Sequence, residues 1–251
     1  MLVRRAPASV RGAYQGLGAQ RAGLDVSKLR DTPFGVRWEE DLAALGPVNL
    51  AVDVGANEGQ TAQLIASAFP SARIFSYEPV PATFEVLQRR YAGSPDITCI
   101  QAAMGAEVGR AQITTGPISG QNTLITDAKP DQPTVEVPVT TLAVQAIEHG
   151  WNEIDLLKVD TEGYEVEVLD GAQQLLRDGL VRFVLVECDF VRRPSEPHGF
   201  FPDIYGLLDP LRYRVVAFYT AAVDGQGWIW GDVLFMKETR RRQVLFTPTP
   251  P

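Results

Sequence analysis

The chain has 251 residues, of which 45% are hydrophobic and 22% charged, and its formal charge is −8 at pH 7. This composition is typical of a folded globular protein and excludes an intrinsically disordered chain. The negative charge argues against a nucleic acid as the main partner, because binding to a phosphate backbone depends on basic patches. Two cysteines, Cys99 and Cys188, are too few for a disulfide framework or a structural zinc site.

The absence of membrane and export signals predicts where the protein works. No run approaches the roughly 18 apolar residues of a membrane-spanning helix. Arg4 and Arg5 near the start are not followed by the apolar run of a signal peptide. The sequence therefore predicts a cytoplasmic protein without membrane insertion.

The order of elements predicts one α/β domain at 48–238, preceded by an N-terminal helical extension at 1–47. Within the extension, we expect helices near 10–22 and 36–45. From residue 49 onward, short apolar runs alternate with helical segments, which is the pattern of βαβ units around a parallel sheet. The predicted strands are 49–54, 73–77, 97–103, 154–159, 182–187, 213–219 and 229–236. The predicted helices are 60–69, 81–92, 141–149 and 164–177.

The middle and the end of the chain differ from this alternation. Two further strands are expected at 111–115 and 134–140, separated by a polar loop at 116–133. The length and polarity of that loop predict a functional segment, and closure over a bound ligand is one hypothesis. Residues 239–251 are expected to form a solvated tail.

The first predicted strand runs into the sequence DVGANEG at residues 53–59. Glycine at the end of a strand lets the backbone turn sharply and approach a ligand, and the next helix offers free N–H groups. The G-x-x-x-G spacing differs from the G-x-G-x-x-G fingerprint of dinucleotide sites, and no lysine follows as in a Walker loop. Asp53 beside the loop suits a ligand with a cationic end. A plain strand-to-helix turn is the structural alternative.

Glu78 ends the second predicted strand, nineteen residues after Gly59. At this position α/β nucleotide-binding proteins place a carboxylate that accepts hydrogen bonds from both ribose hydroxyls. The alternative role for Glu78 is to cap the helix that follows Pro79. Together, the loop and the acid favour an adenosine-bearing ligand.

A second group of acids follows the strand predicted at 154–159. Asp160 and Glu162 lie at the edge where open α/β sheets bind ligands, although each could instead cap a helix. Alternation along the strand places Lys158 and Asp160 on the same side, so an ion pair is expected. Glu165 begins the next helix, where it is expected to offset the helix dipole.

Glu187 and Asp189 end the next strand and are expected to face the same cleft. With Asp160 they form a carboxylate set of the kind that Mg²⁺ prefers. Such acids are also frequent without a metal, so no metal ligand is assigned. His198, in a proline-rich loop, is a candidate base, with an ordinary solvated histidine as the alternative.

Five segments, in order and with compatible spacing, resemble the FkbM-type methyltransferases over about residues 48–190. They are VDVGANEG at 52–59, YEP at 77–79, AAMG at 102–105, TL at 141–142 and LKVDTEGYE at 157–165. The resemblance implies a class I, Rossmann-like methyltransferase sandwich that uses S-adenosylmethionine. It also implies a seven-stranded, mostly parallel sheet whose last strand is antiparallel.

The resemblance further implies roles for individual residues. The loop at 53–59 would hold the methionine part of the cofactor, and Glu78 would hold the ribose. Ala102 and Ala103 would form the wall against adenine, and Asp160 would lie near the methionine amine and the transferred methyl group. The complete set of expected cofactor-binding residues is Asp53, Gly55, Ala56, Asn57, Gly59, Thr61, Glu78, Pro79, Ala102, Ala103 and Asp160.

The leading hypothesis is methyl transfer to a hydroxyl group of a small molecule such as a sugar, a glycoside or a secondary metabolite. A neutral hydroxyl is a poor nucleophile, so a base or a metal such as Mg²⁺ must help its proton leave. The candidate catalytic residues are Asp160, Glu162, Glu187 and His198. N-methylation of a small amine, a non-catalytic adenosine-binding module and an NAD-dependent oxidoreductase are the alternatives, and a homodimer stays open.

Overall fold

The structure is a computed structural model that describes residues 35–115, 133–192 and 199–238. The helix predicted near 10–22, residues 116–132 of the predicted loop, His198 and the tail at 239–251 lie outside the described residues. In the part that is described, no helix is both long and apolar enough to cross a bilayer.

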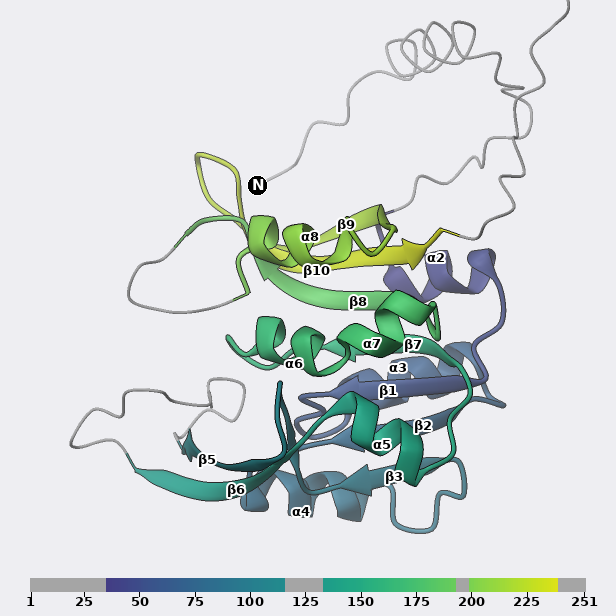
Figure 1. Ribbon diagram of the computed structural model, residues 1–251, viewed down its shortest axis with the longest axis vertical. Helices are drawn as coiled ribbons and strands as arrows, with labels where there is room; N and C mark the ends of the chain where they lie inside the picture. Colours follow the sequence, from purple (N-terminus) through teal and green to yellow (C-terminus); the bar gives the residue numbers. More distant parts are fainter. Residues whose placement is uncertain (1–34, 116–132, 193–198, 239–251) are drawn as a thin grey trace, which may run out of the picture. The chain divides into compact units, whose positions relative to one another are not determined.

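The main sheet is built from strands that match the predicted positions closely (Figure 1). Its strands are β1 (Leu50–Val54), β2 (Arg73–Tyr77), β3 (Ile97–Ile100), β7 (Ile154–Val159), β8 (Val181–Asp189), β9 (Tyr213–Val223) and β10 (Trp228–Lys237). Within the described ranges this sheet has seven strands in the order β3-β2-β1-β7-β8-β10-β9. Neighbours are parallel, except that β10 runs antiparallel to both β8 and β9. The predicted sheet with an antiparallel last strand is confirmed.

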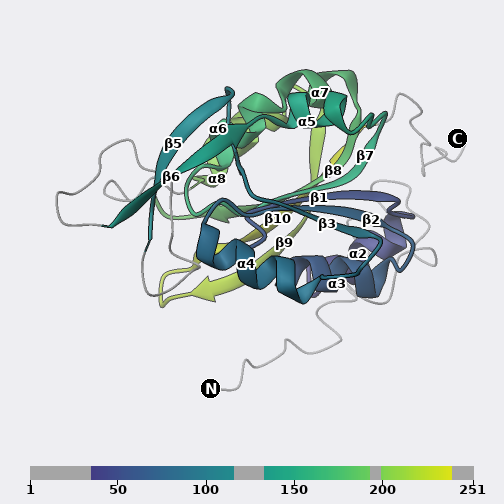
Figure 2. The same cartoon turned by 90° about the horizontal axis from the view of Figure 1, so that it is seen from below.

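Helices cover both faces of this sheet, as Figure 2 shows. One face carries α2 (Trp38–Leu45), α3 (Gln60–Ala68) and α4 (Pro81–Arg90). The other carries α5 (Leu142–Glu148), α6 (Glu165–Gly171), α7 (Gln173–Asp178) and α8 (Phe201–Leu208). All residues of β1 and β7 are buried, as expected for central parallel strands with helices on both sides.

The helix expected at 36–45 is present as α2 and packs onto the sheet. Trp38 and Leu42 join a buried cluster with Ile65 of α3 and Leu234 of β10. The domain boundary predicted between 47 and 48 stays a prediction.

A second, smaller sheet stands beside the main one. It consists of β4 (Ala103–Met104), β5 (Gly109–Thr114) and β6 (Thr134–Thr140), in the order β4-β6-β5. The strand predicted at 97–103 is therefore two strands, because the chain leaves the main sheet after Ile100 and Ala103 pairs with β6. Ile113 and Val137 of this sheet pack against Val80, which begins the turn into α4.

Two helical predictions need correction. The helix expected at 164–177 is two helices, α6 and α7, which meet at Ala172. Helix α8 was not predicted, because Pro202 and the prolines before it suggested a loop. Proline is tolerated in the first turn of a helix, where its missing N–H has no partner in any case, and Pro202 occupies that turn.

Candidate active site

A cavity of about 260 Å³ lies at the carboxyl ends of β1, β2 and β7. Its walls include most of the residues that the sequence singled out. These are Gly55, Ala56, Asn57, Thr61, Glu78, Pro79, Ala102, Ala103, Asp160 and Glu162. Four further lining residues belong to the quoted motifs but were given no role of their own: Val54, Tyr77, Met104 and Thr161. The sequence did not single out the last three, which are Gln60, Val80 and Ile113.

The loop after β1 approaches the loop after β7 so closely that only glycine fits at position 55. Gly55 has φ +81°, and a Cβ atom there would lie 1.7 Å from the carbonyl oxygen of Asp160. The two loops are joined by a hydrogen bond of 3.0 Å from Asp160 N–H to Val54 O. This contact sets the floor of the cavity and brings Asp160 to the first loop.

Asn57 offers an acceptor to the cavity. Its backbone is left-handed, with φ +48°, and its buried side-chain oxygen Oδ1 has no hydrogen-bond partner among the described residues. A buried acceptor without a partner is costly unless a ligand or water satisfies it. Asn57 therefore fits a ligand that donates a hydrogen bond at this point.

Glu78 ties the first loop to the start of α4. One carboxylate oxygen accepts from Asn57 N–H at 3.0 Å and the other accepts from Val80 N–H at 2.9 Å. Burial raises the pKa of Glu78, and these two N–H groups oppose that rise. Each carboxylate oxygen can accept more than one hydrogen bond, so Glu78 can also receive hydroxyl donors from the cavity.

The opposite wall is apolar and comes partly from the small sheet. Ala102 and Met104 are buried beside the main core, while Val80, Ala103 and Ile113 belong to the cluster of the small sheet. An apolar slot of this kind suits a flat aromatic ring such as a nucleobase.

Two residues predicted to bind the cofactor do not line the cavity. Asp53 precedes Val54, so the alternation of β1 turns its side chain to the opposite face, where Ser76 and Lys158 are its neighbours in the ladder. Gly59 lies at the start of α3 with φ +89°, and it packs against the side chain of Tyr91. The binding roles assigned to both stay predictions.

Asp53 makes the free energy of unfolding depend on pH. Burial is the main cause that raises its pKa from 3.8 to about 7. The folded state therefore holds this proton in the range between about pH 4 and pH 7, where the unfolded chain has released it. Stability is lost as pH rises through that range, by up to about 4 kcal/mol at about 1.4 kcal/mol per pH unit.

We expect Asp53→Asn to be more stable than the wild type at pH 8 and to lose this advantage near pH 4, because asparagine does not titrate. Urea unfolding at both pH values measures the difference. Asp96→Asn makes the same substitution at an exposed position and serves as the control. If Asp53→Asn changed the free energy of unfolding equally at both pH values, the raised pKa of Asp53 would be contradicted.

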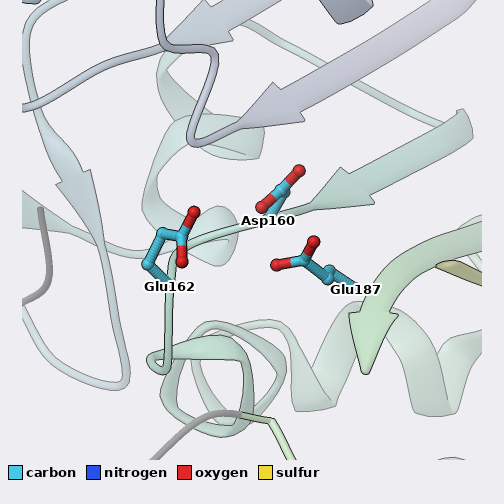
Figure 3. Close-up of side chains that lie close together, drawn as sticks. All are labelled: Asp160, Glu162 and Glu187. Carbon is cyan, nitrogen blue, oxygen red and sulfur yellow. The ribbon is translucent and has the colours of Figure 1, made fainter. Parts of the chain in front are cut away.

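Three carboxylates, those of Asp160, Glu162 and Glu187, lie close together (Figure 3). Asp160 and Glu162 line the cavity, whereas Glu187 lies beside its lining residues, and we call this group of three acids the mouth of the site. Asp160 follows β7, Glu162 lies in the loop after it, and Glu187 lies near the end of β8, with one oxygen of each within 4.8 Å of the others. Glu162 has φ +55°, a strained conformation for a residue with a side chain. The set expected from the sequence contained Asp189 in place of Glu162.

Lys158 is the buried cation beside these acids. The expected ion pair with Asp160 is present at 3.2 Å, and Lys158 also pairs with Asp232 of β10 at 2.7 Å. Burial lowers the pKa of Lys158, but the two carboxylates outweigh burial and raise it. Lys158 therefore stays charged and holds Asp160 in place.

The other two acids of the mouth are harder to ionise. Burial, and then the charge of Asp160, raise the pKa of Glu162 to about 7. The same two causes raise the pKa of Glu187 still further. Near neutral pH, Glu162 can thus take up or release a proton while Glu187 keeps its own.

A family model described as the methyltransferase FkbM domain matches residues 53–215, well over half of the chain. The chain belongs to the FkbM methyltransferase family. Family and fold together make it an S-adenosylmethionine-dependent methyltransferase, as the motifs from residue 52 to residue 165 implied.

Two curated relatives of this FkbM methyltransferase are also named as methyltransferases. "Methyltransferase sdnD" of Sordaria araneosa is 29% identical over 201 residues, which cover 67% of this chain and 75% of that protein. "Methyltransferase 1" of Beauveria bassiana is 27% identical over 170 residues, which cover 59% of this chain and 68% of that protein.

A solved structure supports the fold. The crystal structure of the methyltransferase FkbM from Methylobacillus flagellatus matches this FkbM methyltransferase with a TM-score of 0.52 and 17% identity. The match covers 93% of this chain and 56% of that protein, so the chain spans little more than half the length of that relative. The likeness shows the class I fold.

Proposed function

We propose that this FkbM methyltransferase transfers the methyl group of S-adenosylmethionine to a hydroxyl of a small molecule, such as a sugar, a glycoside or a secondary metabolite. One observation carries the proposal: Glu162, with a pKa of about 7, lines the cavity beside Asp160. A hydroxyl nucleophile needs a base, and a base is most effective when its pKa is near the working pH.

Hydrogen-bond acceptors in the cavity lining support the binding of S-adenosylmethionine. Asn57, with its unpartnered oxygen, and Asp160 would receive the ammonium group, while Glu78 would receive the ribose hydroxyls. Ala102 and Ala103 would flank the adenine. When bound there, the cofactor supplies an electrophilic methyl group on its sulfonium.

The residues of the mouth divide the remaining work. Glu162 would accept the proton of the attacking hydroxyl as that oxygen moves in line with the methyl group. Glu187, which keeps its proton near pH 7, would donate a hydrogen bond to the acceptor molecule. Lys158 would hold the Asp160 side chain in place beside the cofactor through their ion pair.

The acid cluster also bears on the Mg²⁺ hypothesis. Asp160, Glu162 and Glu187 are close enough to share one cation. However, Lys158 already neutralises part of their charge through Asp160. We therefore propose metal-independent transfer, and we expect full activity with EDTA. Loss of activity with EDTA and recovery with Mg²⁺ would assign the cluster to a metal.

We expect calorimetric titration to detect micromolar binding of S-adenosylhomocysteine to the wild type. Glu78→Ala is expected to weaken this binding about 10–100-fold, because a carboxylate that accepts two hydroxyl donors is lost. NAD is the ligand control, and Glu85→Ala, an exposed acid on α4, is the matched protein control.

The titration, followed by turnover assays with hydroxylated acceptors and amines, separates the candidate functions. Binding of NAD in place of S-adenosylhomocysteine would favour an oxidoreductase. Binding of S-adenosylhomocysteine without turnover on any hydroxylated acceptor or amine would favour a non-catalytic module. Turnover with amines alone would replace O-methylation by N-methylation. The cytoplasmic location and the homodimer stay predictions from the sequence.

A further inference from the structure

Glu165 is the first residue of α6, and both oxygens of its buried carboxylate accept hydrogen bonds. The sequence suggested only that Glu165 would offset the helix dipole. The residue is 2% exposed. Its oxygen Oε1 accepts from Thr161 N–H at 2.9 Å, from the Thr161 hydroxyl at 2.9 Å and from Gly163 N–H at 3.1 Å. These bonds fix the turn on which Glu162 is carried.

The second oxygen of Glu165 reaches a different part of the chain. Oε2 accepts from Gly199 N–H at 2.9 Å. The carbonyl oxygen of Gly199 in turn accepts from Asp189 N–H at 2.9 Å, and Phe200 bridges to Asp189. Gly199 is therefore held between Glu165 and the end of β8, two residues beyond Glu187.

The fit between Glu165 and Gly199 leaves no space. A Cβ atom on Gly199 would lie 2.7 Å from Oε2 and 3.1 Å from the Cβ and Cγ atoms of Glu165. A single buried carboxylate thus joins the loop after β7 to the segment that runs from Gly199 into α8. These are the two sides of the mouth that bring Glu162 and Glu187 together.

We propose that Glu165 is a positioning residue that couples cofactor binding at the loop after β7 to the order of the Gly199 segment on the β8 side. The proposal rests on the proposed function for the identity of the ligand. A ligand that stabilises Thr161 and Gly163 also stabilises the carboxylate they hold, and the same carboxylate holds Gly199. The second side of the site is thereby ordered when the first is filled.

Amide hydrogen exchange, measured by NMR with and without S-adenosylhomocysteine, tests the coupling. In the wild type, the ligand is expected to slow exchange at Thr161, Gly163 and Gly199. In Glu165→Gln, the single carbonyl oxygen is expected to keep its three donors, leaving the NH₂ group opposite Gly199 N–H. Gly199 should then exchange about tenfold faster than in the wild type and no longer respond to the ligand.

Two further variants complete the design. Glu167→Gln makes the same substitution in the same turn of α6, at a partly exposed residue without a hydrogen bond to either segment in the described structure, and is expected to behave as wild type. Gly199→Ala presses on Glu165 from the other side. It is expected to speed exchange at Thr161 and Gly163, thirty-eight and thirty-six residues away in sequence.

The outcomes distinguish this inference from the proposed function. If S-adenosylhomocysteine protects Thr161 and Gly163 but not Gly199 in the wild type, the coupling is wrong and the proposed function stands. If the ligand protects none of them, the proposed function fails. The ligand-free comparisons then decide the inference: equal Gly199 exchange in Glu165→Gln and Glu167→Gln, or unchanged Thr161 and Gly163 exchange in Gly199→Ala, would overturn it.

Discussion

Replacing Glu162 with glutamine is expected to lower kcat for methyl transfer about 10²–10⁴-fold, the range in which general-base catalysis contributes. Glutamine keeps the size of the side chain but cannot accept the proton of the hydroxyl. The left-handed backbone at Glu162 is a property of the loop, held by the bonds of Thr161 and Gly163 to Glu165, so the substitution leaves the fold intact. The rate is measured with a hydroxylated acceptor found by screening.

The pH profile gives this prediction its sharpest test. Wild-type kcat should rise with pH through an inflection near 7, because the base acts only when ionised and its pKa is about 7. Glu162→Gln should lack this limb, and its affinity for S-adenosylhomocysteine should stay within a few fold of the wild type. A variant with near-normal kcat and an unchanged profile would remove Glu162 from the proposed mechanism and point to Glu187 or His198.

Replacing Gly55 with alanine is expected to abolish cofactor binding and to destabilise the fold. The left-handed backbone alone costs an alanine about 1–2 kcal/mol. The new Cβ would also lie 1.7 Å from the carbonyl oxygen of Asp160, so the loops after β1 and β7 must separate. A backbone carbonyl group cannot move aside as the end of a flexible side chain can. Separation of the two loops would remove Asp160 from the cavity.

The chain offers a matched control for this substitution. Gly93 has φ +84°, nearly that of Gly55, but a Cβ atom there meets nothing within 4 Å. Gly93→Ala should therefore show the cost of the backbone conformation without the collision, and it should bind S-adenosylhomocysteine as the wild type does. Urea unfolding and calorimetry of both variants measure the difference. Equal losses of stability and of S-adenosylhomocysteine affinity in the two variants would show that the close approach of the loops after β1 and β7 is unimportant.

The sequence predicted the main sheet well because its strands are short apolar runs bounded by strong turn signals. Alternation along β7 was sufficient to predict the pairing of Lys158 with Asp160. The same rule, applied to β1, places Asp53 on the face of the sheet that carries Lys158, its neighbour in the ladder. The binding role that the motif resemblance implied for Asp53 stays a prediction.

What the sequence could not predict depends on contacts between distant residues. Asp232 lies 74 residues after Lys158, and Gly199 lies 34 residues after Glu165. Neither pairing has a local signature, because register between strands and the path of a connecting segment are set by packing. The position of Ile113 in the cavity wall also depends on packing, because Ile113 belongs to the small sheet. The sequence indicated only two of the strands of that sheet.

The position of β10 has a consequence for the order in which the site is made during synthesis. Strand β10 lies between β8 and β9 in the sheet, although it is translated after both. A nascent chain that ends before Trp228 lacks Asp232, so Lys158 is without its shorter ion pair. The strand neighbour that covers β8 is missing as well. The mouth of the site can therefore reach its final charge arrangement only after the last strand has left the ribosome and inserted, which makes the site one of the latest parts of the domain to mature.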